Sequence, residues 1–113
     1  MPNRFYQRGR YGEWRVRDLL RLQGWLVMRS YGSKGPYDLV ALKGGRDPAL
    51  IQVKASSLSM PTVGSTPPAD RQALLAEAIY VDADAVLASY HDGQVRWWRL
   101  LGPTLDLVDE WNP

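Results

Sequence analysis

The sequence predicts a single α/β domain in which helices flank a mixed five-stranded sheet. Two segments, 11–23 and 69–81, repeat apolar residues at helical spacing, and five shorter segments have the apolar and β-branched content of strands. Their order is helix, three strands, helix, two strands, which favours helices layered on a sheet. A chain of 113 residues can form one hydrophobic core but not two.

The composition excludes several kinds of site and compartment. There is no cysteine, hence no disulfide and no thiolate zinc site, and the single histidine, His91, cannot build a multi-histidine metal site. No apolar run is as long as a membrane span, and the first residues, MPNRFYQRGR, lack the apolar centre of a signal peptide. We therefore expect a cytoplasmic protein with no membrane partner and no small-molecule cofactor.

The first helix is expected from Tyr11 to Gln23, because Val16, Leu19 and Leu20 form an apolar stripe and Gly24 supplies a stop. Glu13 falls on the edge of this stripe. A carboxylate near a helix N-terminus is also favoured by the helix dipole, so Glu13 alone does not indicate a site. Residues 1–10 are expected to form a basic N-terminal arm with interleaved aromatic residues, which are Arg4, Phe5, Tyr6, Arg8 and Arg10.

The remaining elements follow from short patterns and turn residues. Strands are expected at 25–29, 37–43 and 49–55, with a GGRDP turn between the last two, and residues 56–68 form a long flexible loop that either covers a ligand or stays mobile. Pro67 and Pro68 introduce the second helix, 69–81. Its inward residues are expected to be Leu74, Leu75, Ala78 and Ile79. Strands 85–90 and 94–100 complete the sheet, and residues 102–113 form a C-terminal tail.

The stretch IQVKAS, residues 51–56, places Gln52 and Lys54 on one side of its strand, because strand side chains alternate between faces. With GGRDP as a five-residue turn, Asp38 lies opposite Lys54 and Val40 opposite Gln52. Directly opposed residues project from the same face, so Asp38, Gln52 and Lys54 converge at the open end of the hairpin. A slip of one residue would scatter them over both faces.

This group has the chemistry of metal-assisted phosphodiester hydrolysis. Mg²⁺ prefers oxygen ligands, which Asp38 and Gln52 provide, and Glu13 adds a second carboxylate if the first helix packs over this edge. Lys54 can stabilise charge on a phosphate or activate a water molecule. Taken singly, the lysine reads as an edge protector and the aspartate as a turn residue, and only their joint placement favours a site.

The charge distribution suits a polyanionic partner. Residues 1–54 contain eleven Lys or Arg and four Asp or Glu, for a net charge of +7, whereas residues 55–113 contain three and eight, for −5. A solvated charged surface would explain this asymmetry as well. The predicted site lies in the basic half, which favours nucleic acid.

These residues resemble the PD-(D/E)xK nuclease superfamily, and within it the archaeal-type Holliday junction resolvases. RGRYGEWRVRDLLRLQGW is similar to their first helix, RSYGSKGPYDLVA to the loop that leads into the catalytic aspartate, and IQVKAS to their catalytic third strand. The likeness covers residues 4–56 well and continues weakly beyond them.

The resemblance implies a restriction-endonuclease-like core and a homodimeric endonuclease that nicks four-way DNA junctions symmetrically, in DNA recombination and repair. It implies Mg²⁺ as the cofactor, with Mn²⁺ as a substitute. The implied catalytic residues are Glu13, Asp38, Gln52 and Lys54, and the implied metal ligands are Glu13, Asp38, Gln52 and the backbone carbonyl of Val53. The implied DNA-binding residues are Arg4, Arg8 and Arg10 of the basic segment and Arg29, Ser30, Ser33 and Lys34 of a mobile loop near the scissile phosphate.

The chain departs from the resolvases at Gln52, where they usually have glutamate. The amide oxygen can still bind a metal ion, but one negative charge is lost, so we expect weaker metal binding. Two other functions stay open: a nuclease of this superfamily that acts on other DNA, as in repair or restriction, and a junction-binding module whose catalysis has lapsed.

Adjacent tryptophans in the last strand bear on the homodimer. Trp97 and Trp98 should face opposite sides of the sheet, so one enters the core and the other lies on a surface that a second subunit could cover. Packing by the C-terminal tail with Trp111 would explain the second tryptophan equally well.

Overall fold

The computed structural model describes the backbone of residues 4–30 and 35–113, and the side chains of residues 11–30 and 35–113. The elements are α1 (Arg4–Leu22), β1 (Leu26–Arg29), β2 (Leu39–Leu42), β3 (Ala49–Ala55), a short 3₁₀ helix η2 (Val63–Ser65), α2 (Pro68–Tyr80), β4 (Asp84–His91), β5 (Gln94–Leu100) and β6 (Val108–Glu110). The strands form one mixed sheet in chain order. All neighbours are antiparallel except β3 and β4, which are parallel and joined through α2.

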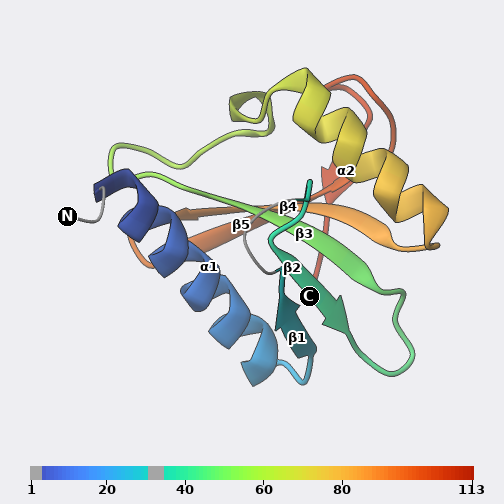
Figure 1. The fold of residues 1–113 in the computed structure, drawn as a ribbon, viewed down its shortest axis with the longest axis horizontal. Coiled ribbons are helices and arrows are strands. Elements are labelled where there is room, and N and C mark those ends of the chain that lie inside the picture. Colours follow the sequence, from blue (N-terminus) through green and yellow to red (C-terminus); the bar gives the residue numbers. More distant parts are fainter. Residues whose placement is uncertain (1–3, 31–34) are drawn as a thin grey trace.

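The two helices cover opposite faces of this sheet (Figure 1), because alternate strand residues feed two separate cores. The α1 core contains Val16, Leu20, Trp25, Val27, Leu39, Ala41, Ala49, Ile51, Val86, Ala88 and Trp111. The α2 core contains Leu50, Leu74, Ala78, Ala85, Leu87 and Leu100. Each fully buried Leu, Ile or Val contributes roughly 1.5–3 kcal/mol, so both helices are firmly attached to the central strands.

Helix α1 is longer than the apolar stripe predicted. It begins at Arg4, so residues 4–10 of the expected arm continue the helix instead of preceding it. Its end matches the prediction: Gly24 has φ +91°, the Gly24 N–H donates to the Arg21 carbonyl at 3.0 Å, and the Trp25 N–H donates to the Leu20 carbonyl at 3.1 Å. Glycine adopts this left-handed conformation without steric cost and allows the chain to enter β1 directly.

The inward face of α2 was predicted only in part. Leu74 and Ala78 are buried and Leu75 is partly buried, but Ile79 is 67% exposed, so its inward placement was wrong. The buried face instead centres on Arg71, Leu74 and Ala78, at spacings of three and four residues, and Ile79 lies about 100° further around the helix. Arg71 is buried because its guanidinium Nη1 donates to the Thr66 carbonyl at 2.6 Å.

Two segments expected to be irregular contain ordered elements. Residues 56–68 include η2, and Pro61 and Thr66 within them are buried. The expected tail contains β6, which makes the sheet six-stranded, not five-stranded. A strand of three residues is too short for an alternating pattern to be recognised in the sequence.

Trp97 and Trp98 face opposite sides of the sheet as predicted, but both are partly buried, Trp97 against the α1 core and Trp98 against the α2 core, so each contacts a core and not just one of them. Trp111 follows β6, and its ring centroid is 5.4 Å from that of Trp97. The C-terminal segment therefore packs on Trp97, which is the alternative to a subunit contact. No helix within the described ranges is both long and apolar enough to cross a membrane.

Candidate active site

The β2–β3 hairpin brings the predicted residues together in a register that differs from the expected one. Leu39 faces Ile51 and Val40 faces Leu50, so the pairing of Asp38 with Lys54 and of Val40 with Gln52 was wrong by two residues. The regular pairing ends at Leu39 and Ile51, because the Asp38 N–H also donates to the Ile51 carbonyl, as at a β-bulge. Strand alternation places Gln52 and Lys54 on one face of β3, and Asp38 lies beside them through the Val53 N–H and the charge of Lys54.

Pro48 ends the strand ladder on the β3 side of the hairpin. Proline has no N–H to give to a strand ladder, and the Pro48 carbonyl accepts a hydrogen bond from the Asp84 N–H of β4 at 2.7 Å. Pairing of β2 with β3 therefore begins at Ala41 and Ala49.

Asp38 precedes β2 and is fixed by the backbone on both sides. Its N–H donates to the Ile51 carbonyl at 2.8 Å, and its carbonyl accepts from the Ser30 N–H at 2.8 Å. Its side-chain Oδ2 accepts from the Val53 N–H, also at 2.8 Å. Burial raises the pKa of the Asp38 carboxyl above its ordinary value, and the hydrogen bond from Val53 and the positive charges of Lys54 and Arg29 oppose this rise.

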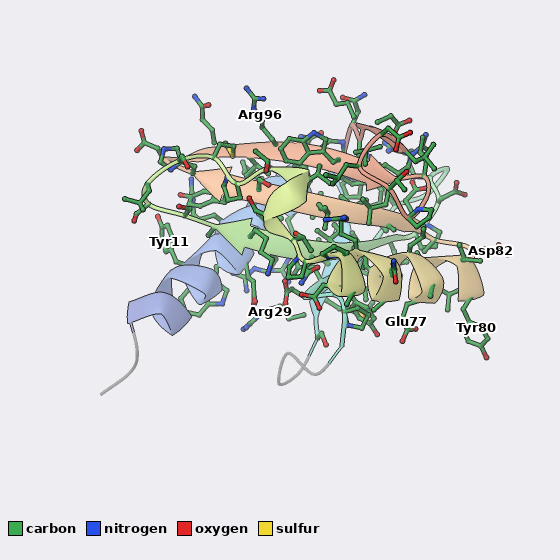
Figure 2. The ribbon with its side chains drawn as sticks, turned by 90° about the horizontal axis from the view of Figure 1, so that it is seen from above. Tyr11, Arg29, Glu77, Tyr80, Asp82 and Arg96 are labelled. Carbon is green, nitrogen blue, oxygen red and sulfur yellow. The ribbon has the colours of Figure 1, made fainter. Side chains whose placement is uncertain are left out.

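Glu13 projects from α1 toward the same carboxyl group. A hydrogen bond between the two side chains also lowers the pKa of Asp38, and such a bond requires a proton on one of the two carboxyl groups. Arg29, the last residue of β1, donates from Nη2 to Glu13 Oε2 at 3.0 Å. Figure 2 shows Arg29 in view between the two helices. The predicted meeting of a helical glutamate with the aspartate is therefore present.

Gln52 presents a polar atom that lacks a partner. Its Oε1 is buried, and no described residue donates a hydrogen bond to it. Most buried polar atoms are hydrogen-bonded, and leaving one unpaired costs about 1–3 kcal/mol. A buried amide oxygen that accepts nothing from the described residues, next to the Val53 peptide that holds Asp38, is suited to receive a ligand, either a cation or a donor group.

Lys54 is half-buried, and its charge is close enough to lower the pKa of Asp38. The Val53 N–H is engaged by Asp38, so its peptide unit adjoins the site, but the ligand role of the Val53 carbonyl stays a prediction. Arg29 and Ser30 contact Glu13 and Asp38. The expected DNA-binding residues Ser33 and Lys34, and the side chains of Arg4, Arg8 and Arg10, lie outside the described parts of the chain.

The donor set fits Mg²⁺, which binds carboxylate and amide oxygens and usually retains several waters. Glu13 and Asp38 supply two carboxyl groups, and Gln52 supplies the unpaired oxygen. Within residues 4–30 and 35–113, no group of three or more His, Cys, Asp or Glu side chains could hold a metal ion. Gln52 is the candidate for a third side-chain oxygen.

Sequence reasoning missed the ion pair between Arg29 and Glu13, which joins residues sixteen positions apart. It also gave no sign of a cavity of about 460 Å³ at the opposite end of β3, lined by Arg46, Asp84, Arg99 and Trp111 among others. The charged groups there are paired with one another, with Arg99 near Asp84 and Trp111 Nε1 donating to Asp84. This cavity therefore lies away from Glu13, Asp38, Gln52 and Lys54, and a search by cavity volume would not find the candidate active site.

Comparisons with known proteins find a similar solved structure. No protein family and no curated protein sequence matches the chain. Among solved structures it is similar to Hjc of Archaeoglobus fulgidus, a Holliday junction resolvase from an archaeal hyperthermophile. The two share 23% sequence identity with a TM-score of 0.60, over 79% of this chain and 70% of that one. The chain therefore has the fold of an archaeal-type junction resolvase, which confirms the predicted fold class with one additional strand.

Proposed function

We propose that this protein is a metal-dependent endonuclease that resolves four-way DNA junctions, acting in DNA recombination and repair. The observation that carries the proposal is the convergence of Glu13 and Asp38 within the charge field of Lys54, beside the unpaired oxygen of Gln52. Burial already makes ionisation of Asp38 unfavourable, and a second acid, Glu13, beside it adds to that cost. A purely structural role would not require Glu13 at this position.

The residues divide the chemistry as follows. Glu13, Asp38 and Gln52 hold Mg²⁺, which when bound polarises a phosphate oxygen and lowers the pKa of a bound water. Lys54 balances negative charge that develops on the phosphate. The proton shared between Glu13 and Asp38 must leave before both carboxylates can bind a cation, so metal binding should strengthen as the pH rises.

Arg29 is placed to respond to both metal and substrate. It neutralises Glu13 in the metal-free protein. If Glu13 held a divalent cation, the Arg29 guanidinium would be free to contact a phosphate, as arginine does in many nucleic-acid sites.

Resolution of a junction also implies two active sites. Two symmetric nicks require two copies of the chain related by a two-fold axis, so we propose a homodimer on functional grounds. Trp97 does not contribute to this argument, because Trp111 covers it. Light scattering after size-exclusion chromatography measures the subunit number directly.

A cleavage assay tests the proposal. The protein is incubated with a synthetic four-way junction, a matching duplex or a single strand, each with Mg²⁺, Mn²⁺ or EDTA. Metal-dependent cutting of the junction alone is the expected result, lost in Asp38→Asn and Lys54→Ala variants whose melting curves show that they are folded. Cutting of the duplex at comparable rates would instead indicate a repair or restriction nuclease.

The second candidate function is a junction-binding module without catalysis, and Gln52 favours it because the substitution of an amide for a carboxylate removes charge from the metal site. Tight junction binding without cutting in any divalent metal would establish it. Recovery of cutting by Gln52→Glu would then identify the lost charge as the cause.

A further inference from the structure

Helix α1 lies close against β3 at Gly12, the residue before Glu13. Gly12 is buried, and a Cβ atom built on it would lie 2.8 Å from Ala55 Cβ, 3.6 Å from Val53 Cγ1 and 3.9 Å from Tyr90 Cβ. Separations below 3.0 Å are essentially never observed for a Cβ atom. Ala55 Cβ is attached directly to the β3 backbone, so this contact cannot be relieved by a change of rotamer.

We infer that Gly12 is a positioning residue: the missing side chain allows α1 to lie close enough to β3 for Glu13 to reach Asp38. The close approach is a property of the fold, whereas its consequence for catalysis rests on the proposed function.

Intrinsic helix preference argues against glycine at this point. Glycine in a helix interior is about 1 kcal/mol less favourable than alanine. Its backbone conformation here is not in the left-handed region, so alanine would suit the helix itself. The close approach to Ala55 is the feature of the fold that requires glycine.

The same contact joins the helix to the strand segment that fixes Asp38. Val53 packs beside Gly12 through Cγ1, and its N–H holds the Asp38 carboxylate. On the helix, the residue after Gly12 is Glu13, whose carboxylate meets Arg29 at 3.0 Å. The two acids are therefore positioned from the two sides of one contact.

A methyl group at position 12 would have to move the helix. Restoring ordinary van der Waals separation from Ala55 requires a displacement of about 1 Å. A shift of that size moves hydrogen-bonding groups beyond bonding range, and misplacement by about 1 Å commonly lowers catalytic rates by about 10²-fold.

The experiment moves the methyl group across the contact. Gly12→Ala introduces it, and the double variant Gly12→Ala/Ala55→Gly removes the opposing one. Gly44→Ala serves as the matched control, because Gly44 lies in the β2–β3 turn and a Cβ atom added there would meet nothing within 4 Å. The readouts are the crystallographic separation of Glu13 from Asp38, Mn²⁺ affinity by calorimetry, single-turnover cleavage at saturating DNA, and the melting temperature.

We expect Gly12→Ala to separate the two acids, weaken Mn²⁺ binding at least tenfold and slow cleavage about 10²-fold, with junction affinity in EDTA unchanged. The double variant should restore all three properties, and Gly44→Ala should resemble the wild type. If Gly12→Ala does not fold, recovery of folding and metal binding in the double variant still supports the inference.

Wild-type acid separation and Mn²⁺ affinity in Gly12→Ala would overturn the inference, as would a double variant that stays defective or unfolded. Failure of the proposed function appears differently, as a wild-type protein that cuts no DNA. In that case the separation of Glu13 from Asp38 in the variants still decides the role of Gly12.

Discussion

Replacing Gln52 with glutamate tests whether this side chain is a metal ligand. Gln52 precedes Val53, whose N–H holds the Asp38 carboxylate, and it has a buried oxygen that accepts no hydrogen bond from the described residues. Glutamate has the same length and replaces the NH₂ group with a second oxygen. The substitution therefore changes charge with little change in shape.

The size of the effect follows from the repulsion between two neighbouring carboxylates. Two like charges about 5 Å apart repel by about 3 kcal/mol at an effective dielectric constant of about 20. Lys54 and Arg29 offset part of this repulsion, so about 3 kcal/mol is the largest loss of stability expected without metal. A divalent cation between the carboxylates reverses the sign and should strengthen Mg²⁺ binding by up to about 3 kcal/mol, or about a hundredfold.

The assay is a Mg²⁺ titration of junction cleavage, paired with Mn²⁺ calorimetry and thermal melting in EDTA. Gln52→Glu should lower the metal concentration at half-maximal rate tenfold to a hundredfold and lower the melting temperature without metal. Gln52→Met should do the reverse, because it removes an unpaired buried oxygen worth about 1–3 kcal/mol together with the ligand. Gln94→Glu, at an exposed end of β5, controls for net charge.

An unchanged or higher Mg²⁺ requirement in folded Gln52→Glu would refute the ligand role. If both Gln52 variants behaved like the wild type toward metal, Glu13 and Asp38 alone would form the binding site.

Three further outcomes follow from the charges around the site. Because burial raises the pKa of Asp38, the contribution of this group to stability is fully present below its ordinary pKa of 3.8 and is lost as the pH rises through the folded-state value. Asp38→Asn should therefore raise the melting temperature of the metal-free protein at pH 7 and remove this pH dependence. Calorimetry that shows an unaltered pH profile would contradict this expectation. Arg29→Ala removes a positive charge beside Glu13, so Mn²⁺ should bind at least as tightly as before. Junction cleavage should slow at least tenfold, and Arg29→Lys should be intermediate. Weakened Mn²⁺ binding would show that Arg29 supports the metal site instead of competing with the metal ion. Replacing Arg8 and Arg10 together with alanine should lower junction affinity and reduce the slope of log affinity against log salt by about 0.9 for each lost phosphate contact, and an unchanged slope in filter binding would exclude both side chains from the interface.

The sequence predicted the elements and the composition of the site better than its geometry. Strand alternation depends only on whether positions are odd or even, so an error of two residues in the hairpin left Gln52 and Lys54 on one face of β3. Asp38 reaches the site through its hydrogen bond from the Val53 N–H, which local patterns do not encode. The burial of Arg71 was missed for the same reason, because its guanidinium is held by the Thr66 carbonyl just before α2, a polar contact that an apolar pattern does not predict.

Contacts between α1 and the sheet could not be predicted from local patterns. The amphipathic stripe of α1 predicts that Val16 and Leu20 face the sheet, but it does not predict how closely the helix approaches. That separation is decided by the small residues Gly12 and Ala55, which have no periodic signal. Glu13 was recognisable as a candidate in the sequence, yet whether it reaches Asp38 depends on this packing.

The energetics of the site favour a ligand over a purely structural role. Asp38 is buried at a cost to its ionisation, Gln52 buries an oxygen to which no described residue donates, and Glu13 adds a second acid to the same place. The burial of Asp38 and of the unpaired oxygen lowers the stability of the metal-free fold, and a divalent cation bound by the carboxylates and the amide oxygen would relieve both costs. Groups that destabilise the fold but would all be stabilised by the same ligand are expected where ligand binding, not folding, determines which residues are present.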